Sequence, residues 1–307
     1  GGRSFPAGSY VIPPQAFRPY VVDPMEPKEF PDRRQYPGGP PIPPYDMTGY
    51  ELRYQMGLEV VNVDEPFDMP SGAWGSVARD VGTVAGDGRG YLVHPNANWL
   101  YRGLAERIGR GEARRTTRTT ADASAGAYWL PELTAAQART LASEHGLTLT
   151  RPSGGVDAAA PVAVRMPRVA IYRSWQAPMP EGWTRWVLDQ YGFAWENVRD
   201  ADVRGGALSG FDVLVVPSQR ASGIRNGHAP GRMPPQYVGG LGDEGVAAIE
   251  AFVRRGGRVV AFDQAVDFAI EAFDLPFRNV VADLPTEEFF LPGSIIRRDA
   301  EDARPPG

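Results

Sequence analysis

The sequence predicts an α/β protein whose last part folds as a doubly wound, mostly parallel sheet. Three observations support this fold class. Short apolar strands alternate with amphipathic helices after residue 155, residues 1–45 hold 12 of the 30 prolines, and a Gly- and Ala-rich stretch at 154–161 separates the two patterns. Alternating strands and helices are typical of a parallel sheet that helices cover on both faces. We therefore divide the chain into residues 1–50, 51–155 and 156–307.

The composition excludes some classes of protein and leaves others open. A chain of 307 residues with 42% apolar residues is long enough to bury a sizeable core. The 32 basic and 37 acidic residues give a net charge of −5 with no long run of either sign, so we expect no nucleic-acid partner. The absence of cysteine removes disulfides and thiolate chemistry. No apolar run approaches the roughly 18 residues that a membrane span needs, and the compartment stays open.

Residues 1–50 are predicted to form an extended connector. Proline fixes its own φ and lacks an N–H group, so a proline-rich stretch such as 36–45 holds neither a regular helix nor an interior strand. The connector also contains several aromatic residues, which are uncommon in disordered linkers. We expect it to be pinned onto a neighbouring surface; its aromatic residues include Tyr10, Phe17, Tyr20, Phe30, Tyr36 and Tyr45.

Residues 51–155 are predicted to form a small α/β unit. Helical spacing of apolar residues and Gly stop signals define two helices, and short apolar runs define the strands. The expected elements are a strand at 58–63, a Gly-rich loop at 84–90, a strand at 91–93, a helix from about 99 to 110 capped by Asn96 or Asn98, a strand at 127–130 and a helix at 134–144 that ends at Gly146.

Residues 156–307 carry the predicted parallel sheet. Its elements are a strand at 168–172, a helix around Trp183 to Tyr191, a strand at 211–217, a long loop at 218–241, a helix at 243–255, and a strand from Arg258 that turns into a helix at about Gln264. The helix at 243–255 should bury Val246, Ile249, Phe252 and Val253, and the spacing of Trp186 favours a core position. A further short strand is expected at 294–297.

Candidate site residues follow the three predicted parallel strands. Ligands of open parallel sheets bind beyond the carboxyl ends of the strands, where the strand order reverses. The loops that follow the strands should therefore meet in a ligand-binding cleft. Its candidate residues are Arg173, Trp175, Gln219, Arg220, His228, Asp263 and Gln264.

The turn at 263–265 occupies the place where many α/β enzymes hold a nucleophile. A nucleophile there is normally Ser or Cys, paired with a histidine. This turn instead reads Asp263-Gln264-Ala265. Asp263 is then either a carboxylate nucleophile, with His228 as its candidate histidine, or a cap of the following helix.

No metal site is expected from the histidines. The chain has three, His94, His145 and His228, and none of them begins a His-x-x-Glu or His-Glu-x-x-His motif. The glycines at 86–90 do not follow the Gly-x-Gly-x-x-Gly order of a dinucleotide site. We expect neither a metal nor another cofactor in this chain.

Several motifs, in order along the chain, resemble the region that follows the catalytic domain in large bacterial zinc carboxypeptidases of the carboxypeptidase A type. In that family a class I glutamine amidotransferase-like domain follows the peptidase. The motifs are Tyr36-Pro-Gly-Gly-Pro-Pro, Pro44-Tyr-Asp-Met-Thr-Gly-Tyr50 with Gln55-Met-Gly57, Tyr172-Arg-Ser-Trp175, Glu181-Gly-Trp-Thr-Arg-Trp186 and Glu287-Glu-Phe-Phe-Leu-Pro-Gly293.

The resemblance implies an amidotransferase-like or flavodoxin-like fold and a role in proteolysis through the parent hydrolase. The zinc and the glutamate base of the family belong to the preceding domain, and this sequence has Gln264-Ala265 where the amidotransferase frame would have cysteine. The resemblance also implies a secreted or periplasmic parent, and a chain that is a fragment cut short at its C-terminus.

Three functions are expected in decreasing order of support. The first is a non-catalytic accessory region of a zinc metallocarboxypeptidase, with the peptidase domain as its partner. The second is a sugar- or peptide-binding module that uses the strand-end residues. The third is a hydrolase that uses Asp263.

Overall fold

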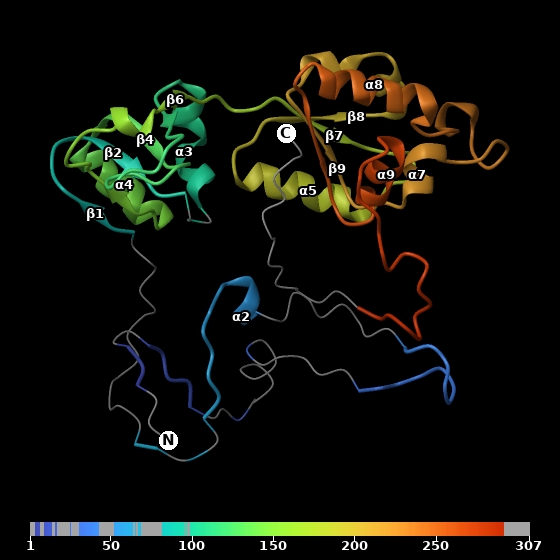
Figure 1. Ribbon diagram of the computed structural model, residues 1–307, viewed down its shortest axis with the longest axis horizontal. Helices are drawn as coiled ribbons and strands as arrows, with labels where there is room; N and C mark the ends of the chain where they lie inside the picture. Colours follow the sequence, from blue (N-terminus) through green and yellow to red (C-terminus); the bar gives the residue numbers. More distant parts are fainter. Residues whose placement is uncertain are drawn as a thin grey trace. The chain divides into compact units, whose positions relative to one another are not determined.

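The computed structural model describes residues 4–6, 9–13, 16, 25, 31–42, 52–63, 65, 67–68, 82–95, 97 and 99–291. The chain forms two compact units, one of residues 1–74 with 279–307 and the other of residues 75–278 (Figure 1). The predicted caps Asn96 and Asn98 and the predicted strand at 294–297 lie outside the described residues.

The described part of the first unit includes a turn at 33–42 and a short helix. Residues 33–42 fold back on themselves, because Ile42 N donates to Arg33 O at 2.8 Å and Gly39 N donates to Tyr36 O at 2.8 Å. The helix α2 spans Leu52–Gln55. The prediction of a strand at 58–63 is wrong, since these residues are irregular. Leu58 and Val63 are exposed, so the apolar run is not buried against a sheet.

A six-stranded mixed sheet begins the second unit, and its last strand lies beyond the predicted boundary at residue 155. Its strand order is β1-β5-β2-β4-β3-β6, and only the β1–β5 pair is parallel. The strands are β1 (Val84–Ala85), β2 (Arg89–Val93), β3 (Arg114–Arg115), β4 (Tyr128–Thr134), β5 (Leu149–Thr150) and β6 (Val162–Ala163). A 3-10 turn, η2, spans Asp157–Ala159.

Two helices, α3 (Leu100–Gly109) and α4 (Ala135–His145), pack with this sheet in one apolar core. The spacing of Leu100, Leu104 and Ile108 puts all three in that core. The helix α4 begins with a capping box, in which Thr134 and Gln137 each accept from the other's backbone N–H. It ends at Gly146, whose φ of 62° suits glycine.

A four-stranded, wholly parallel sheet follows in the order β10-β9-β7-β8. Its strands are β7 (Val169–Tyr172), β8 (Trp195–Val198), β9 (Val213–Val216) and β10 (Arg258–Ala261). The helices between and after them are α5 (Met179–Gln190), α6 (Asp200–Arg204), α7 (Ala221–Asn226), α8 (Gly242–Arg254) and α9 (Ala265–Ala272), and two 3-10 turns are η3 (Ala207–Gly210) and η4 (Pro235–Tyr237).

Helices cover both faces of the parallel sheet, with α5 and α8 on opposite sides (Figure 1). Val169, Ile171 and Val215 form a buried cluster with Leu188 of α5. The alternate strand residues, such as Ala170 and Leu214, join the core that contains α8 and α9. The α/β class with a helix-covered parallel sheet is therefore confirmed.

Several element predictions in this part were incomplete or wrong. The strand β8 and the helix α6 were missed, and the predicted loop at 218–241 contains α7 and η4. Trp186 is 54% exposed and Val253 is 45% exposed, so neither is a core residue. The reason for Trp186 is that α5 turns Glu181, rather than its tryptophans, toward the interior.

Asp212 connects the start of β9 to the segment that precedes β7. Its carboxylate accepts two hydrogen bonds from the Arg165 guanidinium, at 2.6 and 2.7 Å, and one from Arg168 N at 2.8 Å. Hydrogen bonds from Arg165 and then Arg168 hold the pKa of Asp212 well below its usual range. The ionised carboxylate is therefore favoured by folding.

We expect Asp212→Asn to lower the urea midpoint at pH 7. A depressed folded pKa contributes stability above the unfolded value of about 3.9, and this contribution is lost as the pH falls through the folded pKa. The difference between wild type and Asp212→Asn should therefore shrink between pH 7 and pH 3 in urea titrations. The control is Asp157→Asn at an exposed position. A pH-independent difference for Asp212→Asn would contradict the prediction.

Candidate functional site

The carboxyl ends of the four parallel strands lie at one edge of the sheet. Since β8 and β9 follow β7 along the chain and flank it in the sheet, the strand order reverses at β7. The loops after β7 and β9 are joined by Gln219 Nε2, which donates to Ser174 Oγ at 3.1 Å. Gln176 N donates to the same oxygen at 2.9 Å, and Ser174 is buried. The reversal point is thus bridged by a fixed polar contact.

Trp175 lies in an aromatic and cationic arrangement at this edge. The guanidinium carbon of Arg199 is 3.5 Å from the centroid of the Trp175 ring. The Tyr237 ring approaches Trp175 edge-on, with 4.6 Å between centroids. His228 Nε2 lies 3.3 Å from Trp175 O. The indole is thus held between Arg199 and Tyr237, and His228 contacts the backbone of the same residue, which fixes a planar surface there.

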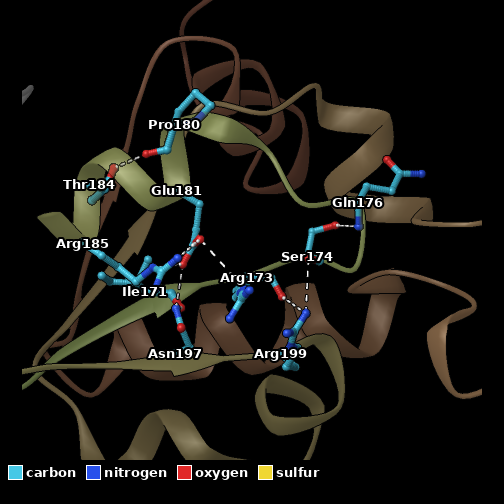
Figure 2. Close-up of polar contacts among 10 residues, drawn as sticks. All are labelled: Ile171, Arg173, Ser174, Gln176, Pro180, Glu181, Thr184, Arg185, Asn197 and Arg199. Carbon is cyan, nitrogen blue, oxygen red and sulfur yellow. Dashed lines mark hydrogen bonds and ion pairs between the residues drawn. The ribbon is translucent and has the colours of Figure 1, made fainter.

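Glu181, in the first turn of α5, is the buried carboxylate of the edge (Figure 2). Its Oε1 accepts from Asn197 Nδ2 at 2.9 Å, and its Oε2 accepts from Arg185 Nη2 at 3.2 Å. Arg185 Nε also lies 2.8 Å from Oε1, as an ion pair without hydrogen-bond alignment. Arg173 Nε is 3.9 Å from Oε2. The buried charge is therefore paired, as burial requires.

A second buried acid lies under the same edge. Asp200 accepts a hydrogen bond from Tyr172 OH at 2.6 Å, and both residues are buried. Burial is the main cause that raises the pKa of Asp200 above its usual value, and burial also raises the pKa of Tyr172. This pair holds the end of β7 against the start of α6.

The turn at 263–265 has the strained backbone of a strand-to-helix elbow. Asp263 has a φ of +46°, which is uncommon for a residue with a side chain. Its carboxylate accepts from Ser218 Oγ at 2.7 Å, and Gln264, at the N-cap of α9, makes no side-chain cap bond. Asp263 therefore ties the ends of β9 and β10 together instead of capping α9.

The structure brings some of the predicted residues together and leaves others apart. Arg173, Trp175, Gln219 and His228 share a network of contacts with Ser174 and Arg199. Asp263, Gln264 and Arg220 have no hydrogen bond or ion pair with that network among the described residues. Arg220 is exposed at the start of α7. The hydrolase alternative needs a contact between Asp263 and His228. The described contacts of these two residues do not include one.

The sequence did not predict five residues of this edge as site residues. These five residues, together with Arg173 and Trp175, form what we call the strand-end cluster. Three follow from β8 and α6, which the apolar pattern did not reveal because Glu196 and Asn197 interrupt it. The stretch left unassigned between the predicted strands at 168–172 and 211–217 could have revealed these two elements, since it is long enough for another strand and helix. The missed residues are Ser174, Glu181, Asn197, Arg199 and Asp200.

The described residues show neither a candidate metal site nor a candidate membrane span. Among the described residues, no group of three or more His, Cys, Asp or Glu side chains could hold a metal ion. Within the same residues, no helix is long and apolar enough to span a bilayer.

A cavity of about 210 Å³ lies in the mixed-sheet part, lined by Arg107, Arg110, Glu112, Leu130, Glu132, Leu133 and Gln137.

Fold and site together define an α/β protein whose polar and aromatic residues gather at the carboxyl ends of a parallel sheet. Comparison with protein-family models, with curated proteins and with solved structures gives no match. A more specific assignment therefore depends on the residues of the chain itself.

Proposed function

We propose that this chain is a non-catalytic accessory region of a zinc metallocarboxypeptidase. One observation carries the proposal. The motifs Tyr172–Trp175 and Glu181–Trp186, which carry the resemblance to that family, meet at one end of the parallel sheet, where Arg173 Nε lies 3.9 Å from Glu181 Oε2. Motifs that are separate in the sequence thus serve one structural unit.

The contacts of these motif residues suit a structural task. Glu181 is enclosed by Arg185 and Asn197, and Ser174 accepts from Gln176 and Gln219. Such contacts stiffen an edge that packs against a partner, here the peptidase domain of the parent. In this proposal the preceding domain supplies the zinc and the peptide-bond hydrolysis, and this chain shapes access to its cleft.

The finer fold assignment belongs to the same proposal. The order β10-β9-β7-β8 corresponds to the first four strands of a flavodoxin-like 2-1-3-4-5 sheet, an order compatible with a doubly wound amidotransferase-like domain. Asp263 takes the strained position at the elbow and is bonded to Ser218. That bond engages the carboxylate in holding two loops, which supports a non-catalytic elbow.

The purified chain tests the proposal directly. After incubation with zinc and desalting, we expect substoichiometric metal and no release of C-terminal residues from reporter peptides, with a commercial zinc carboxypeptidase as positive control. Sequencing the DNA upstream of the Gly1 codon should reveal, in frame, a domain with a His-x-x-Glu motif. Stoichiometric zinc with peptide turnover by the chain would overturn the proposal.

A second candidate, a peptide- or sugar-binding module, is favoured by one observation. The guanidinium of Arg199 stacks on Trp175, and Tyr237 supports the same indole. Aromatic faces and fixed donors at strand ends are the usual components of small-ligand sites. Saturable binding of a small ligand to the chain is the result that this candidate requires.

A further inference from the structure

We propose that Arg173 and Arg199 form a binding site for a planar carboxylate, such as the free carboxylate of a short peptide, at the carboxyl ends of β7 and β8. The inference deepens the ligand-binding candidate and names its ligand chemistry. It does not depend on the accessory role, because that role is tested by the reading frame and by zinc content.

Three guanidinium groups lie at this edge of the sheet. Those of Arg185 and Arg173 lie beside the Glu181 carboxylate, and that of Arg199 bonds to the backbone of Arg173 and Ser174 (Figure 2). Both oxygens of that carboxylate are already occupied by Arg185 and Asn197. Arg173 reaches it only at 3.9 Å, so most of its donors are left for another acceptor.

Among the described residues, no carboxylate bonds directly to the Arg199 guanidinium. This guanidinium donates to the carbonyl oxygens of Arg173 and Ser174 at 3.5 and 3.4 Å, which are long hydrogen bonds. Burial first, and then the charge of Arg173, lower the pKa of Arg199. The charges of Arg173 and Arg199 repel each other, and an anion bound to both would relieve that repulsion.

Two nearby acids, Asp202 and Asp200, attract Arg199, and each of them bonds to another group. Asp202 attracts Arg199, but its Oδ2 accepts from the backbone N of that residue at 2.8 Å. Asp200 also attracts Arg199, and its carboxyl group is bonded to Tyr172. Both acids therefore have other partners, and neither bonds to the guanidinium within the described contacts.

The Arg199 side chain is preorganised by its contact with Trp175. Its guanidinium carbon lies 3.5 Å from the centroid of the Trp175 ring, which also packs against Tyr237. A guanidinium fixed in one plane loses little conformational entropy when it binds the two oxygens of a carboxylate. The side chain of Arg173 is 36% exposed, so a ligand can reach the pair from solvent.

The charge balance favours a monoanion with planar geometry. Two arginines next to the Glu181 carboxylate offer a modest positive potential, and that carboxylate would repel the second charge of a phosphate dianion. A carboxylate carries one charge and matches the fork of a guanidinium in a bidentate pair. The site therefore fits a carboxylate better than a phosphate.

Isothermal titration calorimetry with matched ligands tests the site on the full chain. We expect N-acetyl-dialanine, with its free carboxylate, to bind saturably, and N-acetyl-dialanine amide to bind at least about tenfold more weakly, because the amide lacks the charge-assisted hydrogen bonds. Inorganic phosphate should not displace the acid at equal concentration. Equal binding of acid and amide, displacement by phosphate, or no binding of the acid would each overturn the proposal.

Substitutions locate the binding within the sheet. Arg199→Gln and Arg173→Gln should each weaken binding of the acid about tenfold or more. Arg199→Lys should also weaken it, since lysine keeps the charge but lacks the planar fork. The matched control is Arg258→Gln, which removes the same charge from an exposed position at the opposite end of the sheet and should leave binding unchanged.

Circular dichroism confirms that each variant is folded. If Arg199→Gln fails to fold, the more exposed Arg173 and the acid–amide pair on wild type still decide the question. Wild-type affinity in both Arg173→Gln and Arg199→Lys, or an equal loss in Arg258→Gln, would contradict the site.

Discussion

Glu181→Gln is expected to destabilise the chain by about 3 kcal/mol at pH 7. Glutamine keeps the shape of the side chain but removes the carboxylate that Arg185 bonds, and it leaves one amide oxygen for the Arg185 and Asn197 donors. Breaking a buried ion pair at one partner costs about 3–5 kcal/mol. We take the lower end because the Arg185 side chain is 32% exposed and water can solvate it. Urea unfolding measures the change.

A matched substitution and a double variant separate charge from volume. Glu196→Gln makes the same chemical change at an exposed position of β8 and should cost less than about 0.5 kcal/mol. The double variant Glu181→Gln with Arg185→Gln should be less destabilised than the sum of the single changes, because it leaves no unpaired arginine at position 185. Equal effects of Glu181→Gln and Glu196→Gln would show that the cluster contributes little.

The strands and helices that depend on a simple apolar period could be predicted from the sequence. The strand β7 is a short run of buried apolar residues, and α4 is bounded by the Thr134 cap and Gly146. Each of these signals acts within a few residues, so it survives without knowledge of the tertiary fold. The parallel sheet and the location of the candidate edge followed from them.

The orientation of α5 could not be predicted, because a long-range contact decides it. Trp183, Trp186 and Val187 form the apolar stripe that the sequence displays, yet all three are exposed. Glu181 faces inward instead, where Asn197 of β8 bonds it. Since the bonding position on β8 is the polar Asn197, next to the polar Glu196, neither the strand nor the partner of Glu181 is visible in the apolar pattern. Most of the strand-end cluster was missed for that reason.

The long region after β9 was misjudged for a different reason. Its Gly and Pro content is typical of a loop, yet α7 forms within it and Gly223 and Ile224 become buried. A Cβ atom at Gly223 would lie 2.8 Å from Gln176 Oε1 and 2.9 Å from Gln219 Nε2. Glycine at position 223 lets Gln176 and Gln219 approach closely. This requirement comes from the tertiary fold and not from the local sequence.

Gly227→Ala should be the most damaging single change near the site, with a loss of at least about 3 kcal/mol of unfolding free energy. Gly227 has φ 60° and ψ −146°, a conformation that is essentially restricted to glycine. An added Cβ atom would lie 1.8 Å from Gly239 O, so the backbone of residues 227 and 239 must separate. Gly227 O also accepts from Gln176 Nε2 at 2.8 Å, and that bond should weaken.

The displacement should reach the strand-end cluster through His228 and Tyr237, which contact Trp175. We therefore expect a changed near-ultraviolet circular dichroism of the tryptophans in Gly227→Ala, together with the lower urea midpoint. Gly239→Ala is the matched control, because its φ of +87° is also positive but no atom lies within 4 Å of the added Cβ. Its cost should be the strain alone, about 1–2 kcal/mol. If both variants unfold at the same urea concentration, backbone strain accounts for the whole effect, and the close packing of residues 227 and 239 does not hold Trp175 in place.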